Sequence, residues 1–301
     1  MSNPVSRILC PIDFSEPSRA ALRYAAAIAT HLGAGLTLLT VNDPLLAEAA
    51  DMSGGTGRLA ADAKSELEKF FRDSLPGSAR RPPAELVVAT GGSAAEILRH
   101  AKDAADLVVM SSHGATGIRK LFFGSTTERV LRETAVPVLV VPRGDLGPET
   151  MADMKKIVRR ILVPVDLSAA LEDQVRVAAG LAETFAAPLL LVHIVEPVRA
   201  VVPGHAYAAN VDSERRGRAE QRLNALVATL PPAARPEALV MFGEPSEEIS
   251  KIANDRGVGL IVMGLHASAL LGARMGSVTY RVLCVTNALI LALPPGTTIR
   301  M

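Results

Sequence analysis

The chain contains few of the residues on which several classes of protein depend. Trp is absent and aromatic residues make up 3% of the 301 residues, so we expect no platform for stacking the bases of nucleic acids. The two cysteines, Cys10 and Cys284, are too few for a disulfide framework or a four-ligand zinc site. Each cysteine lies in an apolar run, and we expect both to be buried and unreactive.

Net charge and long apolar runs are also lacking. The 32 basic and 31 acidic side chains give a formal net charge of +1, which provides no electrostatic attraction for nucleic acid or for an anionic membrane surface. No apolar run reaches the roughly 18 residues of a membrane span, and residues 1–7 contain no apolar core of a signal peptide. With 49% hydrophobic and 21% charged residues, the sequence predicts a globular, cytoplasmic protein.

The most informative feature is an internal repeat. Residues 7–15 read RILCPIDFS and return 153 positions later as RILVPVDLS at residues 160–168. Later in each repeat the offset becomes 152, since Gly124-Ser125 returns as Gly276-Ser277. A period this long predicts two homologous domains rather than a solenoid. We place the domains at residues 1–143 and 158–301, with a linker over 144–157 that contains Gly and Pro but no apolar periodicity.

Each repeat alternates short apolar runs with helical patterns. In the first repeat, strands are predicted at 8–12, 36–41, 86–89, 107–110 and 136–141, and helices from Ser15 and over 59–75, 94–101 and 126–134. Runs that are apolar at nearly every position are typical of strands buried on both faces of a parallel sheet. The predicted fold class is therefore α/β, with two doubly wound domains, each a five-stranded parallel sheet with helices on both faces.

Candidate ligand-binding residues follow the predicted strands. Asp13 comes after the first strand, Val41 closes the second, and the fourth leads into a loop that contains Gly114 and Gly124 before a helix. Glycines let the backbone approach a ligand closely, and the N–H groups at a helix start favour phosphate. Because ligands of such sheets bind beyond the carboxyl ends of the strands, the sequence predicts a nucleotide. The alternative is that Asp13 only introduces the helix and the glycines only make the turn.

These residues resemble the universal stress protein family, and the resemblance covers both repeats. It rests on PIDFS at 11–15, MSSHG at 110–114, Gly124-Ser125, and VPVLVV at 136–141. It implies a Rossmann-like, adenine nucleotide alpha-hydrolase-like fold. Nucleotide-binding members of the family have the pattern Gly-x2-Gly-x9-Gly-Ser/Thr. In the first repeat Ser111 replaces the first glycine. In the second repeat Ala267 replaces the second glycine and the loop is one residue shorter.

The resemblance implies an ATP site in the first domain, with or without Mg²⁺. Its residues would be Pro11, Ile12, Asp13, Val41, Met110, Ser111, His113, Gly114, Gly124, Ser125, Thr126 and Thr127. The weaker counterparts in the second domain would be Asp166, Ile194, Met263, Gly264, Gly276 and Ser277. A Cβ at Ala267 disfavours a positive φ, so the second site is expected to bind poorly, differently or not at all. The first loop also has a basic pair, Arg119 and Lys120, for phosphates, whereas the second loop offers Arg274.

The function implied by the resemblance is a stress-response regulator that binds ATP or another adenine nucleotide. No catalytic residue and no metal ligand is assigned, and ATP hydrolysis would be slow at most. Two alternatives remain open. One is a scaffold whose pockets are vestigial or take another ligand, and the other is an ATPase or nucleotidyl transferase that uses Asp13 or His113.

The resemblance also implies that the domains pair through their last strands. Residues 136–141 and 288–292 are apolar edge candidates, and an unpaired edge invites a partner strand. We therefore expect the two domains to pair within one chain as a pseudo-dimer. A homodimer of whole chains is a further expectation, whereas no nucleic-acid or membrane partner is expected.

Three further patterns suggest chemistry for which the sequence gives less support. The SGGTG segment at 53–57 resembles a phosphate loop but lacks the Lys-Ser/Thr of a P-loop. The Ser-His pair at 112–113 suggests a hydrolase, yet the chain has no Gly-x-Ser-x-Gly elbow. The second repeat suggests a metal site, whose spacing is not diagnostic, from Asp166, His193 and His266.

Overall fold

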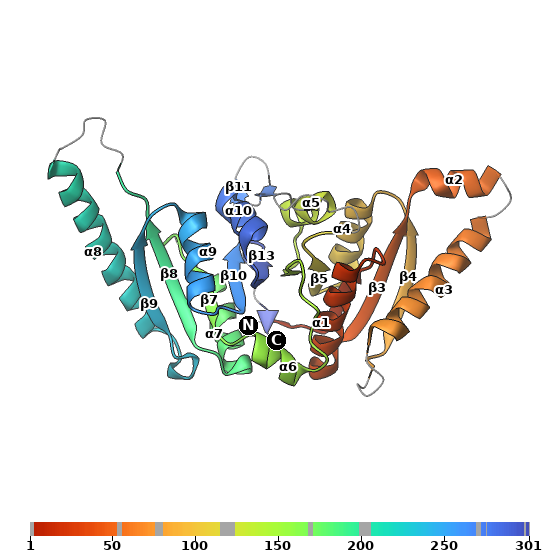
Figure 1. Cartoon of the computed structure of the whole chain (residues 1–301), viewed down its shortest axis with the longest axis horizontal. Helices are drawn as coiled ribbons and strands as arrows, with labels where there is room; N and C mark the ends of the chain where they lie inside the picture. The colour runs from red at the N-terminus through yellow and green to blue at the C-terminus, as the bar shows by residue number, and fades with distance from the viewer. Residues whose placement is uncertain are drawn as a thin grey trace.

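A computed structural model of the chain describes residues 3–52, 56–75, 81–114, 124–167, 171–198, 206–268, 272–274, 276–297 and 299–300. Figure 1 shows that one large sheet extends across the whole molecule, with helices packed along it. In the described part of the chain this sheet has ten strands, and each predicted domain contributes half of it. The α/β architecture with two five-stranded halves is therefore confirmed.

The first half begins with the predicted strand–helix alternation. Its elements are β2 (Arg7–Pro11), α1 (Glu16–Leu32), β3 (Gly35–Asn42), α2 (Pro44–Met52), α3 (Thr56–Ser74), β4 (Ala84–Thr90), α4 (Ser93–Ala104), β5 (Leu107–Ser111), α5 (Ser125–Glu133) and β6 (Val138–Val141). The five strands lie where the apolar runs predict them, although the last begins at Val138 rather than at residue 136. Helix α2 was not expected from the sequence, and none of its described side chains is buried.

The second half repeats this order with additions. Its elements are β7 (Ile161–Pro164), α7 (Leu171–Phe185), β8 (Leu189–Val195), α8 (Ala206–Ala228), η1 (Pro232–Ala234), β9 (Glu237–Phe242), α9 (Pro245–Asp255), β10 (Leu260–Gly264), β11 (His266–Ser268), β12 (Gly272–Arg274), α10 (Ser277–Val285) and β13 (Leu289–Leu293). Strands β11 and β12 pair with each other in an antiparallel ribbon outside the main sheet.

The main sheet has the strand order β4-β3-β2-β5-β6-β13-β10-β7-β8-β9. Strands within each half are parallel, whereas β6 and β13 pair in antiparallel fashion at the centre. Leu139 pairs with Leu291 there, and these two leucines occupy equivalent positions of the repeat. A pseudo-twofold axis therefore passes through this pair, as in the isologous interface of a homodimer. The two domains form one continuous sheet, as pairing through the last strands predicts.

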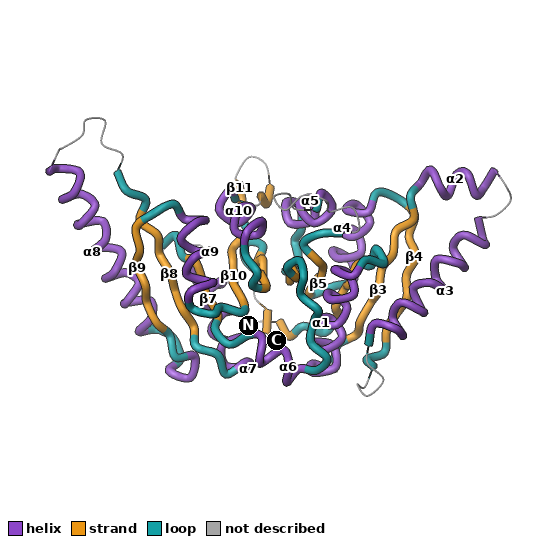
Figure 2. The backbone as a smooth tube through the Cα atoms, viewed as in Figure 1, coloured by secondary structure: helices purple, strands orange, loops and turns teal. Residues whose placement is uncertain are grey.

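Two apolar layers hold the helices to the sheet. One face packs against α1, α3, α7 and α8, and the other against α4, α5, α9 and α10 (Figure 2). Alternate residues of one strand serve the two layers: in β5, Leu107 and Val109 belong to the first and Val108 and Met110 to the second. This arrangement explains why the strands are apolar at nearly every position.

The segment between the domains contains a helix that the sequence did not predict. Residues 144–157, expected as a linker without apolar periodicity, include α6 (Met151–Ile157). Thr150 caps this helix, because its side chain accepts a hydrogen bond from the Asp153 N–H. Met154 is buried in the first layer, and Tyr24 of α1 donates its hydroxyl proton to Asp145 over 2.8 Å. The segment is therefore packed against the first domain.

The two ends of the described chain lie side by side. Strand β1 (Asn3–Pro4) pairs in parallel with β14 (Ile299–Arg300), close to α6 in Figure 1. Cys10 is buried, and burial raises the pKa of its thiol, as expected for an unreactive cysteine. Cys284 is only partly buried, contrary to expectation. None of the described helices has the length and apolar character needed to cross a bilayer.

Candidate functional site

In the first domain, the turn after β2 brings a carboxylate against a glycine. Asp13 accepts hydrogen bonds from the Ser15 N–H at 3.1 Å and the Ser15 hydroxyl at 2.5 Å, both through Oδ1. Ser15 in turn caps α1, as the sequence predicts, by accepting from the Ser18 N–H. The other oxygen of Asp13 lies so close to Gly114 that a Cβ added there would be 2.5 Å from it. The end of the first strand and the loop after β5 therefore meet at one point.

The loop after β5 is held by its own hydrogen bonds. The Ser111 hydroxyl donates to the His113 carbonyl at 2.8 Å, and the Ser112 hydroxyl lies 2.9 Å from Nδ1 of His113. Ser112 and His113 are both buried, which suits residues that organise a loop better than a nucleophile and base. Gly124 donates its N–H to the Ser112 carbonyl at 3.0 Å. The start of α5 is thereby fixed next to the end of the strand.

Helix α5 begins without a side-chain cap. Gly124 occupies the N-cap position and has no side-chain hydrogen bond to offer. Ser125 is exposed and Thr126 partly exposed at the first turn, whereas Thr127 is buried and donates to the Ser111 carbonyl at 3.0 Å. The first-turn carboxylate of Glu128 pairs with Arg132 at 2.7 Å. Backbone N–H groups and two hydroxyls are thus available to an anion at this helix start.

The remaining first-domain candidates surround this point from the sheet. Pro11 ends β2, and Val41 lies near the end of the neighbouring strand β3; both are partly exposed. Ile12 and Met110 are almost fully buried and form part of the apolar support. The predicted phosphate contacts of Arg119 and Lys120, like the rest of 115–123, lie outside the described residues.

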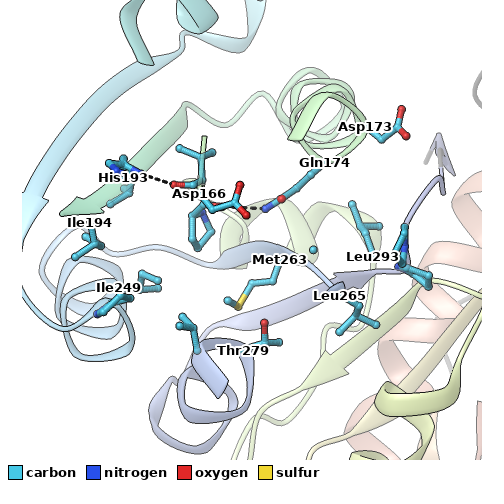
Figure 3. A pocket seen from close by; sticks show the side chains of 18 of the residues that line it. Asp166, Asp173, Gln174, His193, Ile194, Ile249, Met263, Leu265, Thr279 and Leu293 are labelled. Atoms are coloured by element: carbon cyan, nitrogen blue, oxygen red, sulfur yellow. Dashed lines mark hydrogen bonds between the residues drawn. The ribbon is translucent and has the colours of Figure 1, made fainter. Parts of the chain in front are cut away.

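The second domain contains a cavity of about 510 Å³ at the carboxyl ends of β7, β8 and β10. Its size is typical of small-molecule sites. Four of the six second-domain candidates line it, namely Asp166, Ile194, Met263 and Gly264. Gly276 and Ser277, at the start of α10, are not among its lining residues. Figure 3 shows that aliphatic side chains such as Ile194, Ile249 and Leu265 surround a few polar groups.

Two of those polar groups are held by backbone carbonyls. His193 contacts the Val165 carbonyl through Nδ1 at 2.7 Å, so in the neutral ring Nδ1 has the proton and Nε2 is an acceptor. Gln174 donates through Nε2 to the carbonyls of Pro164 at 3.1 Å and Val262 at 2.9 Å. Figure 3 shows both side chains, with His193 and Gln174 each joined by a dashed line to a neighbouring residue of the lining.

Sequence reasoning missed Gln174, although a signal was present. Gln174 stands 153 positions after Ala21, and Ala21 is fully buried in α1. A polar residue in the repeat position of a buried alanine is a sign of an internal hydrogen-bonding role.

Comparison with known proteins identifies the repeat. The model of the universal stress protein family matches residues 4–142 and again residues 158–288. This chain belongs to the universal stress protein family. Each match coincides with one half of the ten-stranded sheet, so the molecule consists of two universal stress protein domains in tandem.

Individual relatives match single domains or the whole chain. A universal stress protein of Methanocaldococcus jannaschii is 28% identical over 159 residues, which cover 48% of this chain and 98% of that protein. A universal stress protein of Bacillus subtilis is 28% identical over 145 residues, covering 45% of this chain and 98% of that protein. The crystal structure of a universal stress protein from Archaeoglobus fulgidus covers 96% of both chains with a TM-score of 0.65 at 18% identity. The last likeness shows the fold alone.

The two universal stress protein domains differ in the loop that follows the fourth strand of the family fold. In the first domain Gly114 adjoins Asp13. In the second, Ala267 stands at the corresponding position, within β11, which pairs with β12 in an antiparallel ribbon. Among the described residues of both domains, no three His, Cys, Asp or Glu side chains gather as metal ligands do. The side chain of His266, one of the residues considered for a metal site, lies outside the description.

Proposed function

We propose that this universal stress protein binds ATP, or another adenine nucleotide, through its first domain and acts as a regulator. The observation that supports this most is the approach of Asp13 to Gly114 beside the start of α5. It brings a carboxylate, a glycine backbone and an uncapped helix start within reach of one ligand. The nucleotide would bias an equilibrium between conformations or partners.

The chemistry of the three groups matches the parts of a nucleotide. A carboxylate at a strand end accepts hydrogen bonds from ribose hydroxyls or from the adenine amino group, as in other doubly wound domains. The α5 start, with the hydroxyls of Ser125 and Thr126, offers donors to phosphate oxygens. Gly124 lets the helix start lie close to the loop after β5, because a Cβ there would come within 3.3 Å of the Ser112 carbonyl.

A binding role is favoured over rapid turnover. Oδ1 of Asp13 is already engaged by Ser15, and Nδ1 of His113 contacts the Ser112 hydroxyl. These bonds give both side chains structural roles in their loops, and His113 is buried, which favours binding over general-base catalysis. We therefore expect ATP hydrolysis to be slow at most.

The test places a negative side chain at the helix start. In the full chain, Gly124→Glu would put a carboxylate where phosphate is expected and would crowd the Ser112 carbonyl. We expect the affinity for Mg-ATP in the first domain to fall at least a hundredfold in calorimetric titration. The matched control is Gly276→Glu, the equivalent change in the second domain, which should leave that affinity unchanged. Equal affinities of Gly124→Glu and the unaltered protein would refute the assigned site, provided that circular dichroism shows both folded.

A scaffold role is the second candidate, and helix α2 supports it. Leu45, Leu46 and Met52 are exposed large apolar side chains on one short helix, and such groups often contact other proteins. If this role is the main one, the Gly124→Glu variant retains full function in cells that lack the native protein. Loss of function in that variant favours the nucleotide-dependent role.

A further inference from the structure

We propose that the second-domain cavity binds a heterocyclic amine without phosphates, of the size of a nucleoside, rather than a nucleotide. The two domains would then sense ligands of different charge. This inference rests on the lining of the second cavity alone, and it does not require the first domain to bind a nucleotide.

The charge of the lining is unfavourable for phosphates. The lining includes the carboxylates of Asp166, Asp173 and Glu196, and among its described residues there is no Lys or Arg. Asp173 pairs with Arg176 at 3.0 Å, and in Figure 3 it lies at the edge of the group of side chains. Acidic side chains thus outnumber basic ones among the described lining residues, and negative charge disfavours an anionic ligand in a partly enclosed site.

The nearest described arginines do not reverse this charge. Arg215, Arg218 and Arg222 of α8 line a smaller neighbouring pocket of about 230 Å³, which shares Asp166 and His193 with the cavity. Arg215 pairs with Asp212 at 3.1 Å and Arg218 with Glu214 at 2.9 Å. Arg215 and Arg222 also donate to the carbonyls of loops that follow β8 and β7. Two of the three arginines are thus paired with acidic side chains of α8, which reduces the positive charge that they contribute at the cavity.

Hydroxyl groups of the first domain are replaced by aliphatic groups in the second. The Ser112 N–H donates to the Val141 carbonyl at 2.8 Å, and the Leu265 N–H makes the equivalent bond to Leu293 at 2.7 Å. The backbones therefore correspond, and a methyl-bearing side chain stands where the first domain has a hydroxyl. The same exchange occurs at the second helix, since Val278 of α10 lines the cavity at the position of Thr126.

Three polar groups of the lining offer acceptors to a ligand. Both amide protons of Gln174 have backbone carbonyls as partners. The amide therefore offers a ligand only Oε1, which is an acceptor. That oxygen lies beside Gly264, where an added Cβ would be 3.2 Å from it. Neutral His193 offers Nε2 as an acceptor, since Nδ1 contacts the Val165 carbonyl. Together with the carboxylate of Asp166, these groups match the N–H and O–H donors of a heterocyclic amine or a ribose.

Two residue differences between the domains fit each other sterically. The first domain combines Ala21 with Ser111, and the second combines Gln174 with Gly264. Glycine is the residue that leaves room for the amide of Gln174, because even a Cβ would be in tight contact with it. The second domain therefore has an amide where the first has Ala21, and a glycine that accommodates it where the first has Ser111.

The experiment compares two probes that differ only in phosphate. In the full chain with Gly124→Glu, adenosine and Mg-ATP are titrated by calorimetry. We expect adenosine to bind with one site per chain and at least tenfold more tightly than ATP. Gln174→Ala gives the second domain the residue that the first domain has at Ala21, and it should weaken adenosine binding at least tenfold. The double variant Leu265→Ser with Val278→Thr should lower the ratio of adenosine affinity to ATP affinity.

The possible failures can be told apart. If Gly124→Glu binds ATP at least as tightly as adenosine, and Gln174→Ala abolishes that ATP binding, the proposed class of ligand for the second-domain cavity is wrong. If Gly124→Glu still binds ATP and Gln174→Ala does not change that binding, the ATP site assigned to the first domain is contradicted instead. The adenosine result then still decides the inference about the second-domain cavity. Absence of adenosine binding, or adenosine binding that is insensitive to Gln174→Ala in a folded protein, overturns it.

Discussion

The two domains share one topology but join the amino ends of their central strands by different means. In the first, one carboxylate oxygen of Asp106 accepts from the Ser6 N–H at 3.0 Å, the Ser6 hydroxyl at 2.7 Å and the Arg7 N–H at 3.0 Å, while the other accepts from the Arg7 guanidinium at 2.8 Å. In the second, the equivalent residue is Gly259, where a Cβ would lie within 2 Å of the Ile157 carbonyl. One repeat uses a charged side chain and the other a direct backbone contact.

The backbone hydrogen bond beside these residues is the same in both domains. Asp106 donates its N–H to Arg7 at 2.9 Å, and Gly259 donates to Arg160 at 3.1 Å. The repeat therefore preserves the strand pairing, whereas the side chains around it have diverged. The candidate sites at the opposite, carboxyl ends follow the same rule, with hydroxyls in one domain and an amide and imidazole in the other.

The largest effect on stability is expected at Gly259. Gly259→Ala places a Cβ against backbone atoms of Ile157 and Val158, which cannot move aside as a side chain can. We expect the free energy of unfolding to fall by about 3 kcal/mol, measured by urea titration with far-UV circular dichroism. Gly180→Ala in α7 is the matched control, since nothing lies within 4 Å of its added Cβ. The control should be neutral or stabilising by up to about 1 kcal/mol, and a similar loss in both variants would contradict the contact.

A smaller effect, on affinity rather than stability, is expected at Gly114. Gly114→Ala gives the first domain the residue that the second has at Ala267. The new Cβ meets the end of the Asp13 side chain, which can turn away at little cost to folding but then leaves its place in the site. We expect nucleotide affinity to fall about tenfold, or about 1.4 kcal/mol, with little change in the urea midpoint. A normal affinity would show that the position of Asp13 does not matter for binding.

Much of this comparison could be predicted from the sequence, because repeats and apolar runs are local signals. The ten strands of the main sheet, the capping role of Ser15 and the pairing of residues 136–141 with 288–292 were expected, whereas the short strands outside that sheet were not. Helix α2 was missed because it has no buried stripe, and α6 because Met154 is its single buried residue. The role of Gln174 depends on the carbonyls of Pro164, 10 residues away, and Val262, 88 residues away, and in the sequence only the comparison with Ala21 of the first repeat points to it.

The smallest expected effect is a pH-dependent contribution to stability from Asp106 of the first domain. Burial alone would raise the pKa of Asp106, but hydrogen bonds from Arg7 and Ser6 outweigh it and lower the pKa from 3.8 to about 2. A carboxyl whose pKa is lower in the folded state stabilises the protein above its unfolded pKa, and this contribution is lost as pH falls from about 4 to about 2. Gly259, the counterpart of Asp106, has no group that titrates.

Asp106→Asn tests this contribution directly. Because Arg7 is half exposed and its charge is screened, we expect the variant to be less stable by only about 1 kcal/mol at pH 7. The difference in urea midpoint between the variant and the unaltered protein should shrink as pH falls toward 2, since protonated Asp106 also loses its ionic partners. A difference that stays constant over this range would mean that the shape of the hydrogen-bond network, rather than the charge of Asp106, joins the strands of the first domain.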